Sequence, residues 1–321
     1  MSTEVTGGAA VVDVPSGRPA TTATPRPGDP RLARFSLNQR TVPRLSVPDL
    51  VETCLAAGVG AVGLWREPVA EHGLAETARL VRRAGLRVSS LCRGGFLTAA
   101  DQPGRRAAVE DNRRAIEEAA TLGADCLVLV VGGMSEGSRD LAGARERVRE
   151  VLAVLAPEAA AAGVRLAVEP LHPMYVADRA VVSTLDQALD LAAPYPADVL
   201  GVVVDAYHLW WDPRLPELIR RAGPRIASYQ LCDWVLPLAA DVLLARGVMG
   251  DGVIDLAGMA AEVEAAGYTG DVEVEIFNAE VWAAEPRAVL DTVLRRYVTC
   301  CLPPRDDPAA GSGERGEVDR P

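Results

Sequence analysis

The chain has 321 residues, a formal net charge of -11 and 49% hydrophobic residues, and it contains no lysine. Schiff-base catalysts, pyridoxal phosphate enzymes and P-loop nucleotidases are excluded, because each needs a lysine amine at the reacting centre and arginine does not titrate. The acidic balance repels the phosphates of nucleic acids and of anionic membrane surfaces, so neither is expected as a partner.

Both ends of the sequence have the composition of tails. Residues 1–30 and 303–321 are rich in small and polar residues and in proline, without hydrophobic periodicity, so we expect both to be disordered. The N-terminal segment lacks the pattern of a secretion signal, and no apolar run reaches the roughly 18 residues of a membrane span. The six cysteines form no C-x-x-C pair and lie mainly in apolar runs. These features predict a reduced, cytoplasmic protein.

Residues 31–302 alternate short apolar runs with longer segments of helical periodicity. The apolar runs predict strands at 34–38, 59–65, 87–92, 126–131, 165–169, 199–205, 226–232 and 272–277. The amphipathic segments predict helices at 46–58, 73–85, 105–123, 144–163, 184–193, 215–223, 255–267 and 285–298. Several of these helical segments end at a glycine, the residue that best tolerates the left-handed cap after a helix.

This alternation predicts a single (β/α)8 TIM barrel over residues 31–302. A doubly wound sheet usually has fewer strands and carries a glycine-rich phosphate-binding turn after its first strand, and no such turn follows residues 34–38. In a TIM barrel the catalytic side chains lie at the C-terminal ends of the strands. Candidate residues are therefore sought at those ends.

The last four predicted strands each offer an oxygen donor near the C-terminal end: Glu169, Asp205, Gln230 and Glu275. Each carboxylate by itself could simply cap the following helix. Three carboxylates at one barrel mouth, however, repel one another unless protons or a cation compensate. Oxygen ligands favour a hard ion such as Mn or Mg. We predict one divalent cation here, with Glu273 as a less favoured alternative to Glu275 because both share one strand face.

Two histidines and one arginine are candidate substrate contacts. His208 follows Asp205 by three residues, and His172 follows Glu169 by the same interval, although a lone histidine is more often structural. Arg246 lies in a glycine-punctuated loop, where its guanidinium could hold a phosphate, a carboxylate or a hydroxyl. The alternative for Arg246 is a surface turn.

Position alone makes Asn38 and Arg66 candidate substrate contacts, because they end the first and second predicted strands. Trp65, directly before Arg66, also lies at the end of the second predicted strand. In a chain without lysine, binding of an anionic substrate group would fall to Arg246, Arg66 or Arg93.

The order of these residues resembles the sugar phosphate isomerase/epimerase family, the xylose isomerase-like barrels that include hydroxypyruvate isomerase, inosose dehydratase and the ketose 3-epimerases. The resemblance covers residues 34–298, and its most specific stretches are AVEPLHPMY, VVVDAYHLWWDP, CDWVLPL, RGVMGDGVID and GDVEVEIF.

The resemblance implies a divalent cation, commonly Mn, Mg or Co, held by Glu169, Asp205, Gln230 and Glu275. The two glutamates would also transfer protons, and His208 and Arg246 match positions of substrate contacts. Many members carry histidine where this chain has Gln230, whereas hydroxypyruvate isomerase resembles it in using glutamine.

The implied activity is isomerisation or epimerisation of a sugar or sugar-like hydroxy-carbonyl compound through an enediolate, without nucleotide or pyridoxal phosphate. A dehydratase, or a lyase that cleaves C-glycosides, would share the first proton abstraction. A phosphodiesterase resembling apurinic endonuclease is disfavoured by the acidic charge and by the presence of only three histidines. A non-catalytic barrel subunit has no reason to keep three mutually repelling carboxylates. The expected partner is a small carbohydrate, with a homo-oligomer as a further possibility.

Overall fold

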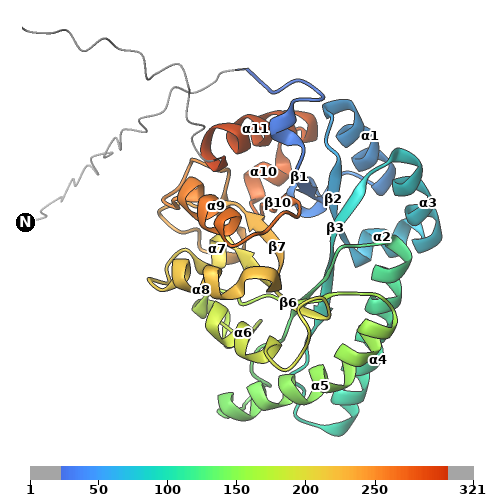
Figure 1. Ribbon diagram of the computed structural model, residues 1–321, viewed down its shortest axis with the longest axis vertical. Coiled ribbons are helices and arrows are strands. Elements are labelled where there is room, and N and C mark those ends of the chain that lie inside the picture. The colour runs from blue at the N-terminus through green and yellow to red at the C-terminus, as the bar shows by residue number, and fades with distance from the viewer. Residues whose placement is uncertain (1–22, 303–321) are drawn as a thin grey trace, which may run out of the picture.

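All eight predicted strands are present in the computed structural model, which describes residues 23–302. They are β1 (Phe35–Asn38), β2 (Ala61–Trp65), β3 (Arg87–Gly95), β4 (Leu127–Val130), β5 (Leu166–Val168), β6 (Leu200–Asp205), β7 (Ile226–Leu231) and β10 (Val272–Val274). The strands pair in parallel in the closed order β1-β10-β7-β6-β5-β4-β3-β2. Figure 1 shows the helices arranged around them. The predicted TIM barrel is confirmed.

The eight predicted helices are also present, each within a few residues of its expected bounds. They are α1 (Val47–Ala57), α3 (Leu74–Ala84), α4 (Gln102–Leu122), α5 (Leu141–Ala161), α6 (Leu185–Ala192), α8 (Leu215–Ala222), α9 (Leu256–Ala265) and α11 (Pro286–Arg296). Side-chain caps define the starts of all of these except α3 and α8, as where Asp101 accepts a hydrogen bond from the N–H of Gly104 before α4.

Three short helices escaped sequence prediction because they are too short to show a hydrophobic period. They are α2 (Arg66–His72), α7 (Ala206–Leu209) and α10 (Ala279–Ala283). Two of them, α2 and α7, begin directly after the last residue of a strand, and α10 begins a few residues after β10. They therefore help to build the C-terminal face of the barrel, where the site is expected.

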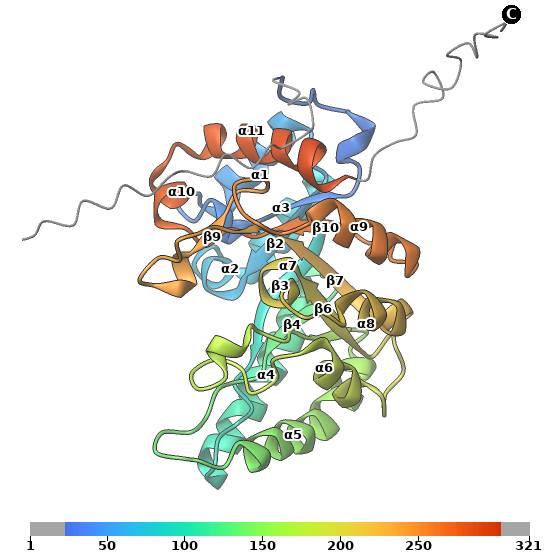
Figure 2. The same ribbon diagram turned by 90° about the vertical axis from the view of Figure 1, so that its left-hand side faces the viewer.

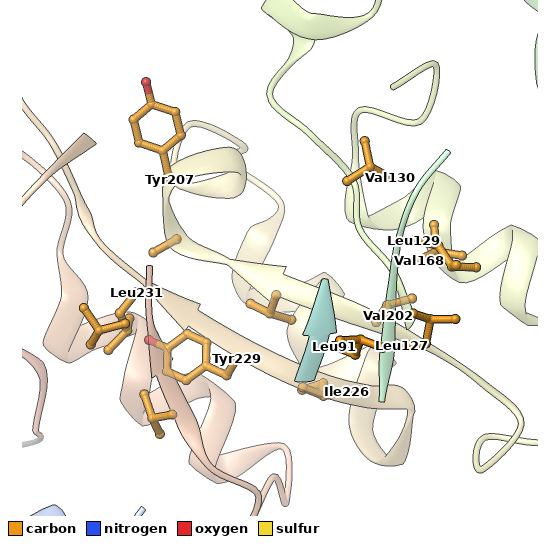
Figure 3. Close-up of a cluster of buried hydrophobic side chains, with 14 of the residues drawn as sticks. Leu91, Leu127, Leu129, Val130, Val168, Val202, Tyr207, Ile226, Tyr229 and Leu231 are labelled. Atoms are coloured by element: carbon orange, nitrogen blue, oxygen red, sulfur yellow. The ribbon is translucent and has the colours of Figure 1, made fainter. Parts of the chain in front are cut away.

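Strand residues alternate between two hydrophobic clusters. Leu127 and Leu129 of β4 join the large cluster that the helices cover, whereas Val128 joins a small cluster with Ala167 and Val203. Figure 3 shows part of the large cluster, including Leu129, Val202 and Tyr229. Because side chains alternate along a strand, the residue two positions after Ala167 or Val203 points to the same side as the small cluster.

A two-stranded antiparallel ribbon lies outside the barrel, formed by β8 (Asp233–Trp234) and β9 (Arg246–Gly247). The sequence suggested only a loop here. Asn278, which caps α10, donates a hydrogen bond from Nδ2 to the backbone carbonyl of Arg246, and Figure 2 shows β9 close to α10. The ribbon is therefore attached to the loop that follows β10.

The expected tails at 1–22 and 303–321 lie outside the described residues. Residues 23–30, which the sequence assigned to the N-terminal tail, are described, and Arg295 of α11 donates a hydrogen bond of 3.0 Å to the Thr24 hydroxyl. Contact with the barrel thus begins before the expected boundary at residue 31. All six cysteines are free thiols. Among residues 23–302, no helix has the length and apolarity needed to cross a membrane.

Candidate metal and substrate site

A cavity of about 200 Å³ opens at the C-terminal ends of the strands. Trp65 ends β2, Glu169 directly follows β5 and Glu275 directly follows β10, and all three line it. The charged lining consists of four arginines and three glutamates: Arg40, Arg93, Arg179, Arg246, Glu67, Glu169 and Glu275. The cavity therefore lies where the barrel fold predicts a site.

The three predicted carboxylate ligands are buried and fall into two neighbouring groups. Ligand atoms of Glu169, Asp205 and His208 lie within 4.8 Å of one another. Glu275 forms a similar group with Cys92 and Glu273. Glu169 and Asp205 face inward because each follows a small-cluster residue by two positions on its strand.

Arg246 joins the two groups. Its Nη1 lies 2.7 Å from Glu275 Oε2 and 3.4 Å from Asp205 Oδ2, and its Nη2 lies 3.2 Å from His208 Nε2. The arginine side chain is only 5% exposed. A fixed positive charge thus stands between carboxylates that the sequence assigned to a cation.

The ribbon explains how Arg246 reaches this position. Arg246 pairs with Trp234 across β8 and β9. The Asp233 carboxylate accepts hydrogen bonds of 2.8–3.1 Å from the backbone N–H groups of Gly250, Gly252 and Ile254, which fold the following loop back onto the ribbon. Only the folded chain brings this arginine, sixteen residues beyond Gln230, over the barrel.

Aromatic rings enclose the guanidinium of Arg246. Its Cζ lies 5.1 Å from the ring centroid of Tyr207 and 4.9 Å from that of Phe277. Tyr207 is held in turn, because its hydroxyl donates to the backbone carbonyl of Val242 at 2.9 Å. Cation–π contacts of this kind stabilise a desolvated charge.

Burial dominates the titration of the carboxylates. It raises the pKa of Glu275 to about 7, an effect that the nearby Arg246 partly opposes. Burial also raises the pKa of Glu169 well above its ordinary value, with Asp205 acting in the same direction, and it raises the pKa of Asp205. Burial therefore destabilises the ionised form of these carboxyls, and a nearby positive charge stabilises it.

His208 is kept neutral, because burial and then Arg246 lower its pKa well below the ordinary value. Its Nδ1 faces the backbone N–H of His172 at 3.2 Å, and its Nε2 faces Arg246. A neutral imidazole has one N–H and one acceptor nitrogen, so it satisfies only one of these two donors. If Nδ1 accepts from His172, Nε2–H is a donor that Arg246 cannot use.

Gln230 has the features expected of a neutral metal ligand. It lies in register with Asp205 across β6 and β7 and is 1% exposed. Its Nε2 faces Glu273 Oε1 at 3.5 Å, whereas its Oε1 has no hydrogen-bond partner among residues 23–302. A buried amide oxygen without a donor is costly and suits a cation. The predicted ligands all offer oxygen donors, which suit a hard divalent ion, although Asp205 and Gln230 do not themselves line the cavity.

Glu273 occupies a different environment from Glu275. Its carboxylate accepts hydrogen bonds from Asn38 Nδ2 at 2.6 Å and from the hydroxyls of Ser89 and Ser90 at 2.6 and 2.8 Å. It is fully buried and does not line the cavity. Glu275 is therefore the glutamate of this strand that faces the cavity, as the sequence favoured.

Asn38 does not reach the cavity, which corrects its assignment as a substrate contact. Besides its bond to Glu273, its Oδ1 accepts a hydrogen bond of 2.9 Å from the Trp65 indole. Asn38 is buried in the barrel, where Glu273 and Trp65 satisfy its amide.

Arg66 is corrected in the same way. It begins α2 and turns towards α4, where its guanidinium donates to Glu118 at 2.6 Å and to Asp111 at 3.0 Å. Trp65, one residue earlier, takes the position on the cavity wall.

His172 also lies off the cavity. Its ring packs 4.9 Å from Trp234 and 5.7 Å from Trp211, and its Nδ1 accepts a hydrogen bond from the N–H of Met174. His172 caps the turn after β5 and contacts His208 through its backbone.

Arg40 and Arg179 line the cavity but were not singled out from the sequence. Arg40 follows the first strand by two residues, so its position was a usable signal. Arg179 lies about ten residues beyond β5, where no local pattern places it.

A family model matches most of the folded part of the chain. The family model described as xylose isomerase-like TIM barrel matches residues 51–295. This range contains all four predicted metal ligands.

Two curated relatives share parts of the sequence. A 3-dehydroshikimate dehydratase from Pseudomonas aeruginosa is 36% identical over 174 residues, which make up 52% of this chain and 26% of that protein. An inosose isomerase from Bacillus velezensis is 26% identical over 229 residues, which make up 70% of this chain and 80% of that protein. The chain thus spans about a quarter of the dehydratase and most of the isomerase.

Solved structures show the same fold. Protein SMc04130 from Sinorhizobium meliloti 1021 is 48% identical with a TM-score of 0.82, and the match covers 84% of this chain and 99% of that one. The IolI protein, whose structure contains a zinc atom, is 23% identical with a TM-score of 0.72, covering 83% of this chain and 96% of that one. The second likeness concerns the fold alone.

Proposed function

The chain belongs to the xylose isomerase-like TIM barrel family, and on that premise we propose that it is a divalent-metal-dependent isomerase or epimerase of a sugar or sugar-like hydroxy-carbonyl compound. The observation that carries the proposal is a set of three buried carboxylates at the barrel mouth: Glu169 and Glu275 line the cavity, and a carboxylate oxygen of Asp205 lies within 4.8 Å of one of Glu169. The inosose isomerase relative supports an isomerase.

The cation would be held by Glu169, Asp205, Gln230 and Glu275, and Mn, Mg or Co suits this oxygen-only set. Bound there, it would supply Lewis acidity to the substrate carbonyl. Zinc belongs in the test because the IolI structure contains it.

Glu169 and Glu275 are the proposed proton-transfer groups. Both line the cavity, and their strands β5 and β10 are separated in the barrel by β6 and β7. They therefore approach a bound substrate from different directions. One carboxylate can remove the proton beside the carbonyl, leaving an enediolate, and the other can return a proton to the opposite face, which is epimerisation.

Arg246 and His208 are the proposed contacts to substrate oxygens. Arg246 must release Glu275 before that carboxylate can act as a base, because an ion-paired carboxylate is a poor proton acceptor. Once the guanidinium withdraws, the His208 Nε2–H is free to donate a hydrogen bond to a substrate hydroxyl or carbonyl.

A dehydratase is the second candidate, and the 36% identity with the dehydratase relative favours it. Elimination of water begins with the same proton abstraction, and the two reactions differ in what leaves the intermediate. The same logic covers a lyase that cleaves C-glycosides.

The deciding experiment incubates the protein with added Mn in deuterated water with ketoses, inososes, keto-glycosides and 3-dehydroshikimate, and follows deuterium entry at carbon by NMR. We expect deuterium beside the carbonyl of at least one compound. Glu169→Gln and Glu275→Gln should each slow this exchange about a hundredfold or more, whereas Glu71→Gln, an exposed residue of α2, should not. Undiminished exchange in both cavity variants would overturn the proposal.

A further inference from the structure

The outer part of the cavity carries three arginines that the proposed proton transfer does not use, Arg40, Arg93 and Arg179. The side chains of Arg40 and Arg179 are 30% and 36% exposed, and Arg93 is half-buried. Glu169 and Glu275 are only 5% and 4% exposed. The cavity therefore has a carboxylate floor and an arginine rim.

Arg93 is the member of this rim with an unused charge. Its guanidinium makes no hydrogen bond and no ion pair within residues 23–302, and its Cζ instead faces the rings of Phe96 and Trp65 at 4.5 and 5.9 Å. Burial lowers the pKa of the guanidinium; the nearby Glu67 opposes this shift, and Arg179 adds to it. A half-buried cation beside another cation gains stability from an anion.

Arg40 and Arg179 have weak partners that leave donors unused. Arg40 reaches the exposed carboxylate of Glu67 only at 3.4 Å, and its buried Nε has no hydrogen-bond partner in the described chain. The Nε of Arg179 approaches Oδ2 of its neighbour Asp178 at 3.4 Å, but it makes no hydrogen bond within the described residues. Each can turn at least one N–H group to a ligand.

Two of the arginines contact Trp65. The Cζ atom of Arg40 lies 4.6 Å from the Trp65 ring centroid, and that of Arg93 lies 5.9 Å from it. The indole itself is held by its hydrogen bond to Asn38. One fixed ring therefore contacts both guanidinium groups at the cavity wall.

From this arrangement we propose that Arg93, assisted by Arg40 and Arg179, binds an anionic group of the substrate, a carboxylate or a phosphate, and this inference rests on the proposed function. Arginine forks match the oxygens of both groups. In a chain with net charge -11 and no lysine, four arginines against three glutamates around one cavity is a local reversal of charge.

The size of the cavity limits the substrate. About 200 Å³ is below the roughly 300–1,000 Å³ of pockets that hold drug-sized ligands. The substrate must therefore be compact. Its anionic group must reach the arginine rim while its hydroxy-carbonyl carbon reaches Glu169 and Glu275 at the floor. A sugar acid or a sugar phosphate of monosaccharide size meets both requirements.

The first arm of the test measures binding of inorganic phosphate to the metal-free protein by calorimetry, and of 3-dehydroshikimate, fructose and a fructose phosphate to the Mn-loaded protein. We expect phosphate to bind the metal-free protein, and at least one anionic probe to bind more tightly than fructose. Equal binding of charged and neutral probes, without phosphate binding, would overturn the inference.

The second arm uses variants. Arg93→Gln should weaken the anionic probe that binds about ten- to hundredfold, raising KM more than it lowers kcat, and should leave neutral probes unaffected. Arg106→Gln is the control, because this arginine is exposed on α4 and does not line the cavity. Arg179→Gln serves as a second test should Arg93→Gln fold poorly, as judged by its Tm. Unchanged anion binding in both rim variants contradicts the inference.

The two proposals fail in distinguishable ways. If deuterium enters neutral ketoses and the rim variants have no effect, the proposed reaction is supported and the anion site is contradicted. If phosphate binding depends on Arg93 and no probe takes up deuterium, the anion site is supported and the proposed reaction is contradicted.

Discussion

The Nη1 atom of Arg246 lies 2.7 Å from Oε2 of Glu275, so this arginine forms an ion pair with one of the two proposed proton-transfer groups. The same nitrogen lies 3.4 Å from Asp205. A guanidinium is permanently charged, so it occupies the electrostatic position that a divalent cation would take. Arg246 would therefore compete with the proposed cation for the same carboxylates.

This competition predicts the behaviour of Arg246→Gln. Removing the guanidinium should raise the affinity for Mn about tenfold, since the cation no longer displaces an ion pair, and should lower the Tm of the metal-free protein, where two buried carboxylates lose their counter-charge. Calorimetric titration and thermal melts of chelator-treated protein measure both quantities. A weaker affinity for Mn would show that Arg246 supports the cation.

Substitution of Gln230 should weaken metal binding without lowering the stability of the metal-free protein. Gln230→Leu removes the amide oxygen that has no described partner, so the Tm of the metal-free protein should stay within a few degrees of its original value. The increase in Tm on adding Mn should shrink or vanish in this variant. Gln230→His, which restores a neutral ligand, should recover that increase. Equal stabilisation by Mn in all three proteins would remove Gln230 from the ligand set.

Removing divalent ions should itself destabilise the protein. A ligand at a hundred times its Kd stabilises the folded state by about 2.7 kcal/mol, which for a domain of this size corresponds to a Tm difference of roughly 4–5 °C. Melts of chelator-treated protein with and without each of Mn, Mg, Co and Zn also rank the ions. A Tm insensitive to all four would favour a non-catalytic barrel.

Gly63 should be intolerant of any side chain. A Cβ atom at this position of β2 would lie 2.6 Å from the carboxyl carbon of Glu273, which three hydrogen bonds to Asn38, Ser89 and Ser90 hold in place. Gly63→Ala should cost about 1–3 kcal/mol of unfolding free energy in urea titrations.

Gly60→Ala is the control for that substitution. Its Cβ would meet only the Arg87 guanidinium, at 3.4 Å, which is close to an ordinary contact. Similar losses in both variants would mean that the rigid Glu273 carboxylate is not the cause.

Arg66 should contribute to stability and not to substrate binding. Arg66→Gln should lower the unfolding free energy by about 1 kcal/mol at neutral pH and leave KM unchanged. The Arg66 guanidinium holds the pKa of Asp111 below its ordinary value, so this part of the stability is present above about pH 4 and is lost as the pH falls through the folded-state pKa. Comparing the Tm of the two proteins at pH 7 and pH 3 checks the sign. A higher KM in Arg66→Gln would show that Arg66 takes part in substrate binding.

The order of strands and helices followed from the sequence alone. Buried strands such as β4 and β6 are nearly continuous apolar runs, and the main helices carry an amphipathic period with caps at their ends, so local pattern was enough to identify them. The short helix α7 and the β8–β9 ribbon were missed because each is too brief to carry a period.

The candidate ligands were also accessible from the sequence, because the barrel places every strand end at one mouth and Glu169, Asp205 and Glu275 stand at such ends. The same rule failed for Asn38 and Arg66, since a strand end fixes the height of a residue but not the direction of its side chain. Asn38 turned to a buried carboxylate, and Arg66 turned to two acids on α4.

Only the tertiary structure could bring Arg246 into contact with Glu275, because a ribbon secured by Asp233 carries it there from a loop without periodic pattern. The arginine rim has the same origin, since Arg40, Arg93 and Arg179 are far apart in sequence and meet at one cavity. Local residue patterns determine secondary structure, whereas the balance of charges in a site depends on long-range contacts that sequence spacing does not encode.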